Sequence, residues 1–160
     1  MIHQIRGLQK VDLANLFGRN EADIFASIGH IEATYPGFDN WLHSKVLPGI
    51  RDGSRRAMAV IVDHQVQAIA IAKKTEIERK LCTLWVDPSV RTCGYANELA
   101  IDAFDWLGTN TPLFTVPDTR IVEFGTLLSR WGFTLTQVVD GAYRPGCPEF
   151  VFNGLLRSAS

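Results

Sequence analysis

The chain has 160 residues, of which 46% are hydrophobic and 21% are charged, and its formal net charge at pH 7 is −1. A chain of this length and apolar content is typical of one globular domain with a sizeable core, so we predict a single domain over residues 1–160. Both signs of charge are interspersed, which argues against duplex nucleic acid as the main partner.

The first third of the sequence predicts one short strand followed by helices. Residues 2–8 have the character of a strand, and apolar residues at helical spacing continue over 10–35. A second helix is predicted over 38–50, and we expect Pro48 and Gly49 to end it.

Three strand-like runs follow, at 56–62, 65–72 and 80–86. The link between the first two has the length of a tight hairpin, and the next link is charged and short. Consecutive strands with such links predict an antiparallel meander.

The last part of the chain alternates helices and strands. Apolar residues from Ala96 to Leu107 recur on one helical face, and Gly108 is a suitable stop. The crossover back to a strand at 112–116 predicts parallel pairing with 80–86. The remaining predicted elements are a helix at 121–133 and strands at 134–139 and 149–156. This order predicts a mixed α+β fold.

Other features of the composition set expectations about location and metals. The N-terminal segment has no apolar signal region, and the longest apolar runs are too short to span a bilayer. The three cysteines are widely spaced, and the four histidines have no metal-ligand spacing. We therefore expect a cytoplasmic protein with reduced thiols, no metal and no membrane partner.

The stretch VDPSVRTCGYANELA joins the third meander strand to the helix that follows. Pro88 ends the strand ladder, Arg91 adds a positive charge, and Gly94 lets a backbone or ligand approach closely. The N-terminus of a helix binds phosphate readily in such a setting. Taken locally, an ordinary strand–turn–helix joint remains the alternative to a phosphate cradle.

The spacing Val86-x-Pro88-x-x-Arg91-x-x-Gly94-x-Ala96 resembles the acyl-CoA motif of the GNAT family of N-acetyltransferases, written Arg/Gln-x-x-Gly-x-Gly/Ala. The order of elements along most of the chain resembles that family too. The resemblance implies a GNAT-like fold with a mixed, mostly antiparallel sheet flanked by helices, and acetyl-CoA as cosubstrate. It implies transfer of acetyl to a primary amine by direct attack in a ternary complex. The alternative is a catalytically silent acyl-CoA sensor or interaction module, and a homodimer through the last strands is open in either case.

Matching positions carry the family's cofactor contacts onto this chain. Backbone groups of Trp85 and Val86 would run beside the pantetheine arm, and the Val86 amide would face the thioester carbonyl as an oxyanion donor. Asn97 begins the helix near the pyrophosphate. The amides that would hold the pyrophosphate belong to the cradle residues Arg91, Thr92, Cys93, Gly94, Tyr95 and Ala96.

The chain departs from the family at the proton donor. Many relatives place a Tyr four residues before the Gly of the terminal Gly-Phe, where this sequence has Leu128, and an Asn near Ile121. Glu78 is a candidate base, with a solvated charge as the alternative. Tyr143 lies in a loop that borders the acceptor site in this fold, as a proton relay or substrate wall or as an ordinary packing residue.

Two further segments leave their roles open. Tyr35, Phe38 and Trp41 form either an aromatic lip at the acceptor site or part of the core. The basic segment RDGSRR, 51–56, is by default a solvated turn, with an acidic partner or a CoA phosphate as the alternative. The acceptor itself, a small molecule or a protein, is not specified by the sequence.

Overall fold

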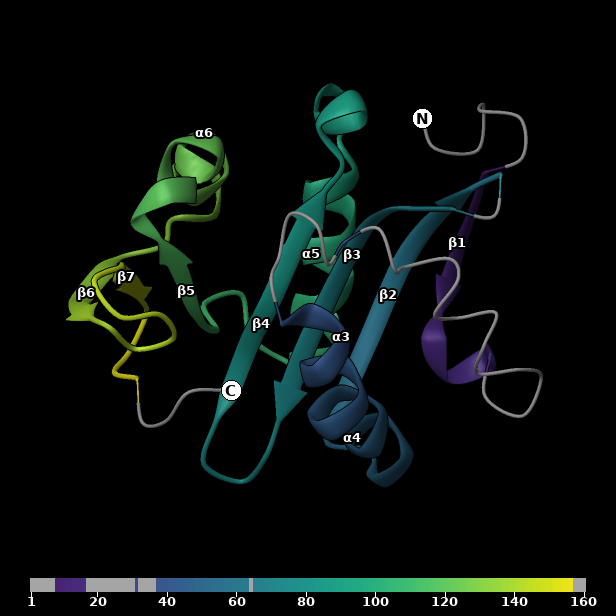
Figure 1. Ribbon diagram of the computed structural model, residues 1–160, viewed down its shortest axis with the longest axis horizontal. Coiled ribbons are helices and arrows are strands. Elements are labelled where there is room, and N and C mark those ends of the chain that lie inside the picture. The colour runs from purple at the N-terminus through teal and green to yellow at the C-terminus, as the bar shows by residue number, and fades with distance from the viewer. Residues whose placement is uncertain (1–7, 17–30, 32–36, 64, 157–160) are drawn as a thin grey trace.

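The computed structural model of the protein describes residues 8–16, 31, 37–63 and 65–156. Its centre is one seven-stranded sheet in the order β1-β2-β3-β4-β5-β7-β6, with helices on both faces (Figure 1). All neighbouring strands pair antiparallel except β4 and β5, which are parallel. The predicted mixed, mostly antiparallel α+β fold is confirmed.

The meander consists of β2 (Arg55–Val62), β3 (Gln65–Lys74) and β4 (Arg79–Val86), as predicted. On the β3–β4 pair, Ile71 faces Thr83 and Ala72 faces Leu81, so Cys82 is an extra residue on β4. A bulge of this kind bends the strand and increases its twist.

The start of the chain differs from the prediction at residues 10–12, while the strand predicted over 2–8 lies, apart from Leu8, outside the described residues. β1 covers Leu8–Asp12 and pairs antiparallel with β2, so residues 10–12 are strand and not the start of a helix. Charge pairing accounts for the difference, because Lys10 lies 2.6 Å from Asp102 and Asp12 lies 3.2 Å from Arg56. A 3-10 turn (Leu13–Leu16) follows, and nearly all of the remaining predicted helix lies outside the described residues.

The second predicted helix continues past its expected end. It runs as α3 (Phe38–Trp41), a π-helical turn (Leu42–Val46) and α4 (Leu47–Asp52), and it stops at Gly53 with φ +84°. A proline inside a helix normally clashes with the carbonyl four residues earlier. The wider π turn immediately before Pro48 relieves that clash, so Pro48 and Gly49 do not end the helix.

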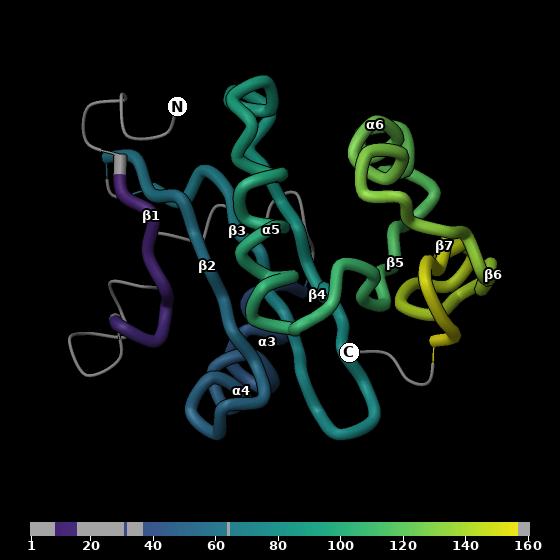
Figure 2. The backbone as a smooth tube through the Cα atoms, turned by 180° about the vertical axis from the view of Figure 1, so that it is seen from behind, coloured from purple at the N-terminus to yellow at the C-terminus, as the bar shows by residue number. Residues whose placement is uncertain are grey.

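Helices cover both faces of the meander. α5 (Tyr95–Leu107) packs on one face and α3 and α4 pack on the other, as Figures 1 and 2 show from opposite sides. Each face has its own buried apolar cluster, one centred on Leu99 and Phe104 and the other on Phe38 and Trp85. No helix in the described residues is long and apolar enough to cross a membrane.

The parallel strands β4 and β5 (Leu113–Pro117) stay together for only two residue pairs, Lys80 with Leu113 and Leu81 with Phe114. Beyond these pairs the strands separate toward their carboxyl ends. The predicted parallel pairing of 80–86 with 112–116 is confirmed at these two pairs, and beyond them the two strands are splayed. The rest of the sheet follows as α6 (Ile121–Trp131), β6 (Leu135–Asp140) and β7 (Pro148–Phe152).

Candidate functional site

The joint after β4 forms a polarised helix end beside the splay. A 3-10 turn (Pro88–Cys93) leads into Gly94, whose φ of +81° lies in the left-handed region, and α5 then begins at Tyr95. Asp87 caps the turn by accepting hydrogen bonds from the Ser89 amide at 3.0 Å and the Ser89 hydroxyl at 2.6 Å. First-turn amides of a helix have no intrahelical acceptor, so this end favours an anion.

The side chains of the predicted cradle have different surroundings. Arg91 lies 3.2 Å from Glu123 on α6, while Cys93 is exposed. The Tyr95 side chain is buried beneath the cradle, so only its amide is available there. Asn97 Oδ1 accepts a hydrogen bond from Trp131 Nε1 at 2.9 Å, so its side chain joins α5 to α6.

Gly94 has a conformational role rather than a steric one within the protein. A Cβ added there would meet no atom within 4 Å, but its positive φ is one that side chains rarely adopt. The sequence predicts a glycine here because a phosphate can approach its backbone closely. The positive φ of Gly94 is a second reason for glycine at this position.

A charged network crosses the splay near the cradle. A 3-10 turn (Asp118–Arg120) follows β5 and ends at Arg120. The Nη2 atom of Arg120 donates a hydrogen bond to the Leu84 carbonyl of β4 at 3.3 Å. Its Nε also donates to Glu123 Oε1 at 2.9 Å, and the other oxygen of Glu123 faces Arg91. The network therefore links β4, the cradle and the first turn of α6, beside the predicted contacts Trp85 and Val86.

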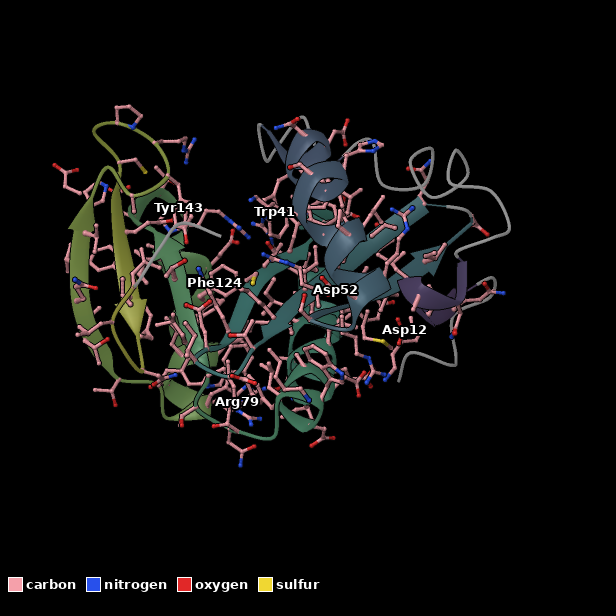
Figure 3. The ribbon with its side chains drawn as sticks, turned by 90° about the horizontal axis from the view of Figure 1, so that it is seen from below. Asp12, Trp41, Asp52, Arg79, Phe124 and Tyr143 are labelled. Carbon is pink, nitrogen blue, oxygen red and sulfur yellow. The ribbon has the colours of Figure 1, made fainter. Side chains whose placement is uncertain are left out.

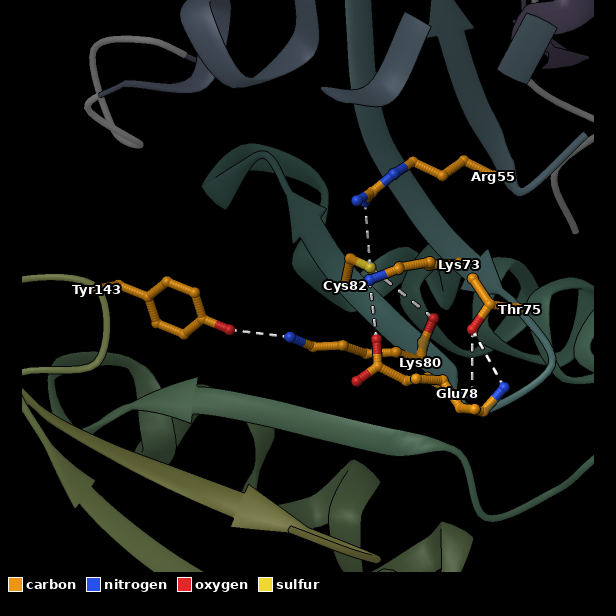
Figure 4. A network of polar contacts seen from close by, with 8 residues as sticks. Arg55, Lys73, Thr75, Glu78, Lys80, Cys82 and Tyr143 are labelled. Atoms are coloured by element: carbon orange, nitrogen blue, oxygen red, sulfur yellow. Dashed lines mark hydrogen bonds and ion pairs between the residues drawn. The ribbon is translucent and has the colours of Figure 1, made fainter. Parts of the chain in front are cut away.

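On the opposite face, Tyr143 meets a buried lysine. Lys80 on β4 is 1% exposed, and its Nζ donates to the Tyr143 hydroxyl at 2.8 Å (Figure 4). Strand alternation places Lys80 on the face away from α5, because the next residue, Leu81, belongs to the α5 cluster. Seen from below, Tyr143 and Trp41 lie on the same side of the sheet (Figure 3). The structure thus brings the predicted loop tyrosine to the predicted acceptor side of β4.

A carboxyl group that sequence reasoning missed lies on the same face. Glu149 on β7 is 6% exposed, and its Oε2 has no hydrogen-bond partner in the described part of the chain. Burial raises the pKa of Glu149 from 4.5 to about 7, against the opposing charges of Arg144, Lys80 and Arg120. The sequence signal was a single acid inside the otherwise apolar strand PEFVF.

Glu78 has a different environment from the one its role as a base requires. Its carboxylate forms an ion pair with Lys73 at 3.0 Å, and its backbone closes the β3–β4 link through Thr75. The Glu78 carboxylate is thus engaged in an ion pair, while its backbone is part of a strand link. Glu78 is nevertheless 8% exposed, so the alternative of a solvated charge is wrong.

The basic segment 51–56 is also not a uniformly solvated turn. Arg55 opens β2 and is 8% exposed, with its guanidinium 5.7 Å from the centre of the Trp41 ring. Its Nη1 donates to Cys82 Sγ at 3.6 Å. Burial raises the pKa of the Cys82 thiol, so this sulfur is a neutral and weak acceptor.

The position of the family's usual tyrosine is part of the core. Leu128 is 7% exposed and belongs to the apolar cluster under α5 and α6. Phe38 is fully packed, and Trp41 is partly buried against the same apolar cluster with Arg55 over its ring, so both take part in core packing. Tyr35 lies outside the described residues.

A scan of protein-family models found no match to this sequence, and a search of curated proteins found none either. Solved structures, however, share its fold. A GNAT-family acetyltransferase from Bacillus cereus has a TM-score of 0.63 at 19% identity, covering 91% of this chain and 93% of its own. A GNAT-family protein from Desulfovibrio desulfuricans has a TM-score of 0.66 at 13% identity, covering 91% and 96%.

An aminoglycoside 6'-N-acetyltransferase, solved with coenzyme A, has a TM-score of 0.59 at 12% identity and covers 91% of this chain and 94% of its own. The fold of this chain is therefore that of the GNAT acetyltransferases. This chain has the GNAT fold over nearly its whole length.

Proposed function

We propose that the protein is an acetyltransferase that moves the acetyl group of acetyl-CoA to a primary amine by direct attack. The observation that carries this proposal is the polarised start of α5 beside a parallel pair that separates after two residue pairs. Solved structures of the same fold that contain acetyl-CoA or coenzyme A support it.

The residues present fit the cosubstrate. The first-turn amides of α5, with Arg91 beside them, suit a pyrophosphate. The separated edge of β4 at Trp85 and Val86 offers backbone groups to an extended arm, in the manner of an added strand. The Val86 amide would then stabilise the oxyanion, an effect worth ~2.7–4 kcal/mol for a comparable donor.

Glu149 replaces Glu78 as our proposed base. An amine of lysine type has a pKa of about 10.4 and must lose a proton before it attacks. A carboxyl group with a pKa of about 7 is partly ionised at neutral pH and is a much stronger proton acceptor than an ordinary carboxylate. Its unpartnered Oε2 is available for this contact.

Tyr143 is the proposed acid for the departing thiolate. Because Lys80 donates to the phenol oxygen, the hydroxyl proton of Tyr143 remains available to a third group. The cation beside the oxygen would also stabilise the phenolate left after proton transfer. Lys80 is a positioning residue in this scheme. Tyr143 takes the role of the family's usual tyrosine, because that position is Leu128 in this chain.

Calorimetry with acetyl-CoA tests the proposal. We expect binding by the wild type and at least about tenfold weaker binding by Arg91→Glu, which reverses a charge at the cradle. Arg130→Glu is the matched control, since Arg130 is exposed in the last turn of α6 and should leave the affinity unchanged. Absence of binding by the wild type, or equal binding by both variants, would contradict the proposal.

A silent acyl-CoA sensor is the second candidate, and Leu128 is the observation that favours it. The two functions differ in turnover and not in binding. Release of coenzyme A with any member of a broad amine panel excludes the sensor. Tight binding without turnover across that panel favours it over the enzyme.

A further inference from the structure

Arg55 is a buried cation that forms no salt bridge with the part of the chain that the structure describes. Its side chain is 8% exposed, and in the described part of the chain its only hydrogen-bond acceptor is the Cys82 sulfur at 3.6 Å. No carboxylate among the described residues lies within ion-pair distance of its guanidinium. A buried charge is costly unless it is paired, so this arrangement calls for an anion.

An unsatisfied donor lies beside Arg55. The Trp41 indole Nε1 is buried and has no hydrogen-bond partner among the described residues, and the Trp41 ring lies 5.7 Å from the Arg55 guanidinium. Buried N–H groups without acceptors are rare in proteins, so this indole, next to a cation whose one acceptor among the described residues is a sulfur, points to an acceptor from outside the chain.

The fold holds Arg55 in this position. A Cβ added to Gly49 of α4 would lie 2.6 Å from both Cγ and Cδ of Arg55, so the aliphatic stem occupies the space of a missing side chain. Gly49 reaches this point only because the helix continues through Pro48. The guanidinium therefore points from a fixed stem toward Cys82 and the cluster around it (Figure 4).

The carboxylates near the guanidinium have other partners. Glu78 forms an ion pair with Lys73 at 3.0 Å, and Asp52, whose pKa is lowered by hydrogen bonds from Ser54 and by the charge of Arg55, accepts from the Ser54 amide at 2.9 Å. Lys80, Arg55 and Lys73 oppose the raised pKa of the buried Cys82 thiol and Glu78 adds to it, so three cations and one carboxylate act on this sulfur, to which Arg55 donates. Glu149 also senses Lys80, so the proposed base borders the same cluster.

We propose that the acceptor amine carries a small oxyanion, a carboxylate or a phosphate, and that Arg55 and Trp41 bind this group while Glu149 receives the amine proton. The inference rests on the acetyltransferase function proposed above and names its substrate class. A guanidinium presents a planar fork of donors that matches two oxygens of either anion. Simple polyamines and basic peptides are disfavoured, because the cluster repels a second positive charge.

The test is a matched ligand series with the wild-type protein. The probes are α-, β- and γ-amino acids, which vary the separation of amine and carboxylate, each with its amide and its aminophosphonate. NMR of the arginine Nε–H signals reports binding at Arg55 directly, and the Arg55 signal is assigned by its loss in Arg55→Lys. We expect at least one carboxylate or phosphonate probe to shift that signal and its amide to leave it unmoved.

Arg55→Gln keeps much of the stem and removes the charge. We expect the preference for the anionic probe over its amide to fall by roughly 10- to 100-fold, the range of a charged hydrogen bond. Arg56→Gln is the control, because Arg56 is the next residue on β2 and pairs with Asp12 at 3.2 Å. If Arg55→Gln fails to fold, Arg55→Lys provides the same comparison, since it keeps a cation and loses the fork.

The possible outcomes test the oxyanion site and the proposed acetyltransferase function separately. Equal affinity for anions and amides, an Arg55 signal that no anionic probe moves, or a preference that survives Arg55→Gln each overturns the inference. Acetyl-CoA binding together with any of these results leaves the acetyltransferase proposal standing. A protein that binds the anionic probes through Arg55 but fails to bind acetyl-CoA keeps its oxyanion site and loses the proposed function.

Discussion

Replacing Glu149 with Gln should reduce activity and increase stability at alkaline pH. The folded carboxyl group has a raised pKa of about 7, so the folded protein holds a proton that the unfolded chain releases above pH 4.5. This group therefore contributes stability fully below its unfolded pKa, and the contribution is lost as pH rises through about 7. Gln is neutral at every pH, so the Glu149→Gln variant does not lose this contribution to stability as the pH rises.

The magnitude follows from the same two pKa values. A rise from 4.5 to about 7 corresponds to about 3.4 kcal/mol at full burial. Water and neighbouring cations screen part of the group, so we expect about 2 kcal/mol. For a chain of this size that is a rise in Tm of about 4–8 °C at pH 8, with little difference at pH 4.

The activity assay follows coenzyme A release with an active acceptor as a function of pH. In the wild type, kcat/KM should rise through pH 7, and Glu149→Gln should lose ~10²–10⁴-fold. Glu78→Gln is the informative comparison, because it breaks the Lys73 ion pair and should cost stability without that loss of activity. Activity of Glu149→Gln within about fivefold of the wild type, or an unchanged pH profile, would refute the assignment of the base.

Three further substitutions test the rest of the site. Tyr143→Phe should lower kcat by about 10²-fold and leave the affinity for acetyl-CoA unchanged, and equal kcat values would exclude Tyr143 as the acid. Gly94→Ala should cost about 1–2 kcal/mol in urea unfolding and weaken acetyl-CoA binding, because φ there is +81°. Gly125→Ala, in open space on α6, is its control and should stabilise by about 0.5–1 kcal/mol. Asn97→Ala should cost about 1–3 kcal/mol by leaving the Trp131 indole unpaired, while calorimetry shows unchanged acetyl-CoA binding; a clear loss of affinity would place the Asn97 side chain in the cradle instead.

Local pattern and chain order were sufficient to predict most of the sheet. The apolar periodicity of the segment ending at Leu107 and the stop at Gly108 gave α5 nearly to the residue, and the short links gave the meander. The parallel crossover followed from length alone. The errors occurred where tertiary contacts override local preference, at Pro48, which a π turn accommodates, and in β1, whose charges pair across elements.

The site was predictable on one side of the sheet only. The cradle is contiguous in sequence, so its motif could be recognised. The proposed acceptor side is assembled from Arg55, Lys80, Tyr143 and Glu149, which are far apart in the chain. Burial, and not identity, makes Arg55, Lys80 and Glu149 unusual, and burial depends on tertiary packing. Glu78 was the candidate base because sequence position alone does not reveal that Lys73 forms an ion pair with it.

The brief contact between β4 and β5 has a mechanical consequence for the whole domain. Two residue pairs form the backbone connection between the first four strands and the last three. Contacts between aromatic rings add to the adhesion of the two parts, with Phe104 of α5 against Trp131 at 5.5 Å and against Phe133 at 5.8 Å. Ring contacts tolerate small rotations that a full hydrogen-bond ladder resists. The strand order is thus continuous across the sheet, but the connection between β4 and β5 is less rigid than the rest. Residues 113–156 should therefore open as a separate unit in hydrogen exchange before the meander does.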